Sequence, residues 1–148
     1  KIPEAANEIG TYLALSLHAP TDDIREMIMP INKKFKIKEL IAQCKYYSSV
    51  VKEKITLEYV MLRGINDSTE CARQLVKLMA QFPCKVNLIE FNPWPGVQYL
   101  PTERSEMEKF GKIIQEAGYV ATIRRSRGQD ILGACGQLRT KSQKIKQQ

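Results

Sequence analysis

The chain has 148 residues, 43% of them hydrophobic and 26% charged, a composition typical of one globular domain with its own core. We expect no membrane span, because no apolar run approaches the roughly 20 residues that a bilayer requires. No charged, apolar and small-residue sequence opens the chain, so no signal peptide is expected either. The net charge of +7 is concentrated in residues 121–148, which indicates either a polyanionic partner such as nucleic acid or only a solvated tail.

Strands and helices are predicted to alternate along the chain. Alternating side chains over 11–18 predict a strand, and Thr21 or Asp22 is suited to cap a short helix that Pro30 interrupts. Three helices are then predicted over 37–51, 72–82 and 107–117, each followed by a strand, at 55–62, 85–91 and 119–125. Thr102 is predicted to cap the last helix.

This order favours a parallel sheet connected by right-handed crossovers. Four strands are half of an eight-stranded barrel, so the sheet is either small and open or part of a larger barrel. Ligands of such folds bind beyond the carboxyl ends of the strands. Those ends are predicted at residues 16–18, 63–66, 92–93 and 124–128, and all four stretches contain polar residues.

Two of these polar residues allow two interpretations each. His18 is the only histidine, and a single histidine is more often a hydrogen-bonded structural group than a site residue. Asn92 either caps a turn or offers its amide to a base-like or amino-acid-like ligand.

The four cysteines form no C-x-x-C pair and no zinc-binding spacing, so free thiols are expected. Cys44, Cys71 and Cys84 are predicted to be small buried hydrophobic residues. Cys135 differs, because it lies among small residues at 133–136, just after a cluster of arginines whose charge favours the thiolate. It is either a reactive thiol or a small residue in a tight loop.

Four blocks of the sequence, taken in order, resemble the C-terminal half of the RlmN/Cfr family of radical S-adenosylmethionine RNA methyltransferases. The blocks are LALSLHAPTDDIREMIMPINKKF, ITLEYVMLRGIND, CKVNLIEFNPWPG and RRSRGQDILGACGQL. The pattern is most similar to the members that methylate C2 of adenine. The resemblance implies an α/β fold in which residues 1–138 form the C-terminal part of a partial, open TIM-like radical SAM barrel, followed by a basic tail at 139–148.

The resemblance also implies roles for individual residues. Ser16, Leu17, His18 and Asn92 would contact S-adenosylmethionine, and Cys135 would carry the methyl group. In the family's mechanism, one S-adenosylmethionine methylates the cysteine, and a second is cleaved at a 4Fe-4S cluster to give a deoxyadenosyl radical. This radical removes hydrogen from the S-methyl group, the carbon radical adds to adenine, and a second cysteine releases the product by forming a disulfide.

The implied substrates are 23S ribosomal RNA and some transfer RNAs of the cytoplasm. Arg124, Arg125 and Arg127 would contact phosphates. The family's C-x-x-x-C-x-x-C cluster motif is absent, so the cluster ligands and the N-terminal part of the protein are expected to lie outside this chain. These 148 residues alone are therefore expected to bind no cluster and not to methylate. The alternative hypothesis is a non-catalytic RNA-binding α/β module.

Overall fold

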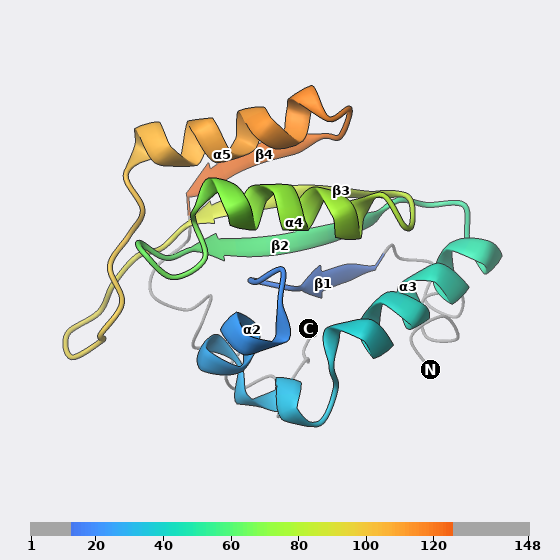
Figure 1. Ribbon diagram of the computed structural model, residues 1–148, viewed down its shortest axis with the longest axis horizontal. Coiled ribbons are helices and arrows are strands. Elements are labelled where there is room, and N and C mark those ends of the chain that lie inside the picture. The colour runs from blue at the N-terminus through green and yellow to red at the C-terminus, as the bar shows by residue number, and fades with distance from the viewer. Residues whose placement is uncertain (1–12, 126–148) are drawn as a thin grey trace.

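The computed structural model describes residues 13–125 (Figure 1). Its elements in chain order are β1 (Ala14–Ser16), α2 (Asp22–Ile28), the 3-10 turn η1 (Pro30–Lys33), α3 (Ile37–Val50), β2 (Ile55–Met61), α4 (Thr69–Met79), β3 (Cys84–Glu90), α5 (Arg104–Glu116) and β4 (Ala121–Arg125). The predicted alternation of strands and helices is confirmed. No helix in this part of the chain is long and apolar enough to cross a membrane.

The four strands form one parallel sheet in the order β1-β2-β3-β4, so their carboxyl ends meet at one edge (Figure 1). Side chains of alternate strand residues, such as Leu57 and Leu88, are fully buried against helices α3, α4 and α5. The rings of Tyr59 on β2 and Phe110 on α5 lie 5.3 Å apart within this core. Helices α3, α4 and α5 therefore cover one face of the sheet, while a smaller cluster that includes Ile28 of α2 and Trp94 covers the carboxyl end of the opposite face.

Side-chain caps fix where two of the helices begin. Thr21 accepts a hydrogen bond from the backbone three residues on at the start of α2, as predicted, and Ser68 does the same for α4. The prediction that Thr102 caps the last helix is wrong, because Glu103 occupies the N-cap position of α5. The Thr102 hydroxyl instead donates to the Asp67 carboxylate at 2.8 Å, a charge-assisted bond that connects the β3–α5 loop to the β2–α4 loop.

Candidate functional site at the carboxyl edge of the sheet

The structure brings the predicted site residues of its described part to one edge of the sheet. Ser16 ends β1 and is followed by Leu17 and His18, Asn92 lies two residues beyond β3, and Arg124 and Arg125 end β4. Cys135 and Arg127 lie outside the described residues. The described residues among them therefore lie at the strand ends, where parallel α/β folds bind their ligands.

The sheet face opposite the helices carries a row of polar side chains, one from each strand. In register, they are Ser16, Glu58, Asn87 and Thr122. The Thr122 hydroxyl and the Asn87 carboxamide are hydrogen-bonded to each other. Burial raises the pKa of Glu58, an effect that the positive charge of Arg124 opposes. Helices α3, α4 and α5 do not cover this row, and convergent polar groups of this kind are typical of a ligand-binding surface.

His18 ends the pairing of β1 with β2. Its backbone has a φ of 62°, in the left-handed region, so the chain turns out of the sheet here. In a continued parallel ladder, the Val60 N–H would donate to the Leu17 carbonyl. It donates instead to Nδ1 of His18 at 3.0 Å. The imidazole therefore replaces a backbone acceptor of the sheet.

That hydrogen bond also sets the charge and tautomer of His18. The side chain is fully buried, and burial, followed by the positive charge of Arg25, lowers the pKa of His18 to about 3. The ring is therefore neutral at pH 7. Because Nδ1 accepts from Val60, the proton of the neutral ring is on Nε2. His18 is thus a structural group and a neutral N–H donor at the same time.

Two side chains from other elements hold the backbone of residues 16–18. Arg25 of α2 is buried, and it donates from Nη2 to the Ser16 carbonyl and from Nε to the Leu17 carbonyl, both at 3.0 Å. Asn66, in the loop after β2, donates from Nδ2 to the His18 carbonyl at 2.8 Å. Each of the three consecutive carbonyls therefore accepts a bond from a buried side chain, which fixes the path of this segment.

Sequence reasoning gave Arg25 and Asn66 no role. Arginine is seldom fully buried, and nothing in the sequence of this short helix marks Arg25 as an exception. Asn66 was noted only as one of several polar residues after a strand. The structure also limits the predicted contact of Leu17 with a ligand. Its side chain is fully buried in the core under the helices, so a ligand can contact only its backbone.

The loop between β3 and α5 folds over the same edge. The ring of Phe91 meets those of Trp94 and Tyr99 edge-on at 5.6 and 6.5 Å, and the Tyr99 hydroxyl donates to the Met27 carbonyl of α2 at 3.1 Å. Asn92 lies within this loop, exposed, and its side chain forms no hydrogen bond with another described residue. Its carboxamide is free to serve a ligand at the strand ends, which was one of its two predicted roles.

Comparison with known proteins identifies relatives of this chain. No protein-family model matches the chain. Over 138 residues, the chain is 54% identical to the dual-specificity RNA methyltransferase RlmN of Granulibacter bethesdensis, covering 93% of this chain and 35% of that protein. It is 50% identical over 149 residues to the RlmN of Agrobacterium fabrum, covering 98% and 36%. The chain matches the C-terminal part of the RlmN family.

Solved structures show the same relationship. A radical SAM methyltransferase from Sphaerobacter thermophilus has a TM-score of 0.82 and 41% identity, over 92% of this chain and 40% of that one. A domain of the pyruvate-formate lyase-activating enzyme from Bacteroides vulgatus shares only the fold, with a TM-score of 0.61 and 13% identity over 81% and 73%. The predicted fold class, part of an open TIM-like radical SAM barrel, is confirmed. The chain spans about a third of the length of its curated RlmN relatives.

The cysteines of the described RlmN-like part are buried and free, as predicted for Cys44, Cys71 and Cys84. Burial raises the pKa of Cys44 to about 11, and burial, followed by the proximity of Cys44, raises that of Cys84 to about 12. Both are therefore protonated, unreactive thiols at pH 7. Residues 13–125 contain no group of three or more His, Cys, Asp or Glu side chains placed to hold a metal ion. The described residues therefore do not fit a 4Fe-4S cluster.

Proposed function

We propose that this chain is the cofactor-binding and methyl-carrying part of an RNA methyltransferase that acts on C2 of adenine in 23S ribosomal RNA and some transfer RNAs. The single observation that carries the proposal is the rigid segment 16–18 at the carboxyl edge, in a chain half identical to RlmN proteins. Within it, residues 1–138 belong to the barrel, and 139–148 form a basic tail.

The described residues fit S-adenosylmethionine, which supplies the methyl group and the radical when bound. The exposed carboxamide of Asn92 offers hydrogen bonds to its polar groups, and His18, at the end of β1, is the second residue proposed to contact it. The low pKa of His18 keeps its ring neutral, so the ring adds no positive charge beside the cofactor's sulfonium. Arg25 keeps its own charge but directs its donors at protein carbonyls.

The same proposal assigns Cys135 as the methyl carrier. C2 of adenine is a poor nucleophile, so a direct polar transfer from the cofactor is chemically unfavourable. The carrier must approach both the cofactor and an unstacked adenine, and the small residues at 133–136 leave room for both. The other three cysteines all lie in the described residues and are buried, so none of them is exposed at the carboxyl edge.

The experiment uses the natural full-length protein with its cluster reconstituted anaerobically. RNA is incubated with S-adenosylmethionine, and its nucleosides are analysed by mass spectrometry for 2-methyladenosine. The wild type should form this nucleoside, and Cys135→Ala should not. Cys44→Ala is the matched control, since Cys44 is a buried thiol of the core, and it should retain activity. RNA binding without any methylation by the wild type would contradict the proposal and support a non-catalytic RNA-binding module.

A further inference from the structure

The turn between η1 and α3 presents an aromatic ring among lysines. Phe35 is 50% exposed, which is unusual for so large an apolar side chain. It lies between Lys34 and Lys36, with Lys33 and Lys38 on either side of these. All four lysines are exposed, and residues 33–38 contain no acidic residue. We name residues 33–38 the lysine–phenylalanine turn.

Two partly buried hydrogen bonds hold this turn. The buried Asn32, just before the turn, donates from Nδ2 to Oδ1 of Asp22 at 3.0 Å. Within the turn, the backbone N–H of Ile37 donates to the same Asp22 oxygen at 2.9 Å. One carboxylate oxygen therefore binds the chain on either side of Phe35. A backbone fixed in this way lowers the entropy cost of binding a partner.

The same network connects the turn to the proposed cofactor site. Nη1 of Arg25 donates to Oδ1 of Asn32 at 3.0 Å, while its other donors hold the carbonyls of Ser16 and Leu17. In Figure 1, α2 lies below the arrowhead end of β1. The lysine–phenylalanine turn begins one residue after Asn32, so this network connects it to the carboxyl end of β1.

The charges of the turn are available to an outside partner. Lys36 pairs with Glu26 at 2.5 Å. Lys33, Lys34 and Lys38 form no ion pair with another described residue. Cations around an exposed ring match single-stranded nucleic acid, because the phosphates attract the cations and the face of an unpaired base stacks on the ring. A duplex hides its base faces and offers the ring nothing to stack on.

We propose that the lysine–phenylalanine turn is a docking surface for single-stranded RNA next to the active edge. Phe35 stacks on an unpaired base near the target adenine, and Lys33, Lys34 and Lys38 contact phosphates. The inference rests on the proposed function, because it takes RNA as the substrate. The turn is connected to β1, at one end of the strand order, whereas Arg124 and Arg125 belong to β4, at the other end. In this proposal, the RNA spans the site between the turn and these arginines.

The test measures binding of a fluorescent single-stranded RNA to the natural full-length protein by anisotropy at several salt concentrations. Phe35→Ala should weaken binding about tenfold, since stacking on one base contributes that much, and Phe35→Trp should restore it. The matched control is Tyr46→Ala, because Tyr46 is a slightly more exposed aromatic (59%) on α3. This control should bind as the wild type does.

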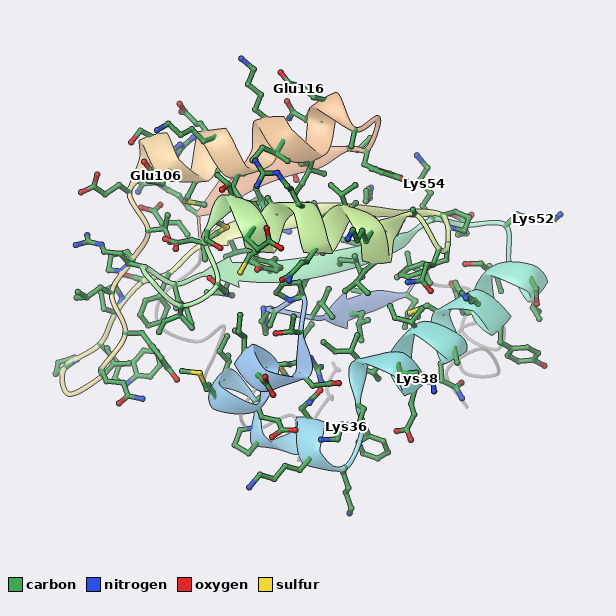
Figure 2. The ribbon with its side chains drawn as sticks, viewed as in Figure 1. Lys36, Lys38, Lys52, Lys54, Glu106 and Glu116 are labelled. Carbon is green, nitrogen blue, oxygen red and sulfur yellow. The ribbon has the colours of Figure 1, made fainter. Side chains whose placement is uncertain are left out.

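The lysines are tested through the salt dependence. The double variant Lys33→Gln/Lys34→Gln should reduce the slope of log affinity against log salt by about 1.4, since each phosphate contact with a single strand contributes about 0.7. Lys52→Gln/Lys54→Gln is the control pair, because these lysines lie beyond the far end of α3 (Figure 2), and it should leave the slope unchanged.

The outcomes separate this inference from the proposed function. If Phe35→Ala and Lys33→Gln/Lys34→Gln bind RNA like the wild type while the wild type still forms 2-methyladenosine, the docking surface is wrong and the proposed function stands. The same holds if Phe35→Ala leaves RNA affinity unchanged but makes the full-length protein more sensitive to proteolysis, because another segment of the protein then covers the ring. If the wild type forms no 2-methyladenosine, the proposed function fails first.

Discussion

The buried histidine makes the stability of the fold depend on pH in a way that can be calculated. His18 has a folded pKa of about 3, against an ordinary value of 6.5. Below pH 6.5 the unfolded chain takes up a proton that the folded His18 does not accept, so acid favours unfolding. The stabilisation is complete above pH 6.5 and is lost as the pH falls toward 3, with an upper limit of about 5 kcal/mol.

Between pH 7 and pH 5 the expected loss is about 2 kcal/mol, because the unfolded histidine becomes almost fully protonated over this range while the folded one stays neutral. The assay is equilibrium urea unfolding at both pH values. His18→Asn is the comparison variant, since asparagine does not titrate, tolerates a left-handed φ and keeps an oxygen that can accept from Val60. Subtracting the free energy of unfolding of the variant from that of the wild type cancels the contribution of the carboxylates.

The difference in the free energy of unfolding between wild type and His18→Asn should therefore shrink by about 2 kcal/mol from pH 7 to pH 5. The chain has one histidine, so no other imidazole can supply this change. An identical pH dependence in the two proteins would show that His18 titrates normally in the folded state. Its role as a neutral acceptor for the sheet would then be wrong.

Three further substitutions test the bonds around the site, each by urea unfolding at pH 7. Arg25→Met should lower the free energy of unfolding by about 3–5 kcal/mol, because it leaves buried carbonyls unpaired, and a loss below about 1 kcal/mol would contradict the role given to Arg25. Asn66→Ala should cost about 2–4 kcal/mol, since it removes the bonds to the His18 carbonyl and the Leu62 N–H; a near-neutral effect would argue against it. Thr102→Val should cost only about 1 kcal/mol through the lost bond to Asp67, and a loss of helix content in α5 would instead support a capping role.

The order of strands and helices could be predicted because it depends on local hydrophobic periodicity. The stripe on α4, for example, contains Cys71, Leu75 and Met79, and all three are buried against the sheet. The gathering of polar residues at the strand ends followed from the parallel topology alone. These features need no knowledge of which side chains meet across the fold.

The bonding partners at the site could not be predicted, since they connect residues distant in sequence. His18 binds Val60, 42 residues away, and Asn66 reaches the His18 carbonyl across 48 residues. The sequence left His18 open between a structural group and a site residue, and the observed Nδ1 bond establishes the structural part. Thr102 was predicted as a cap because threonine suits that position, but α5 begins one residue later, with Glu103 as its N-cap, and the Thr102 hydroxyl donates to the Asp67 carboxylate.

The central claim, that Cys135 carries a methyl group between cofactor and RNA, can be tested on the protein itself. The natural full-length protein is purified after expression with its own iron–sulfur assembly, digested, and the peptide containing Cys135 is analysed by mass spectrometry. The account predicts one additional methyl group on Cys135 and none on Cys44, whose burial keeps it unreactive. An unmodified Cys135 in a preparation that methylates RNA would contradict the account.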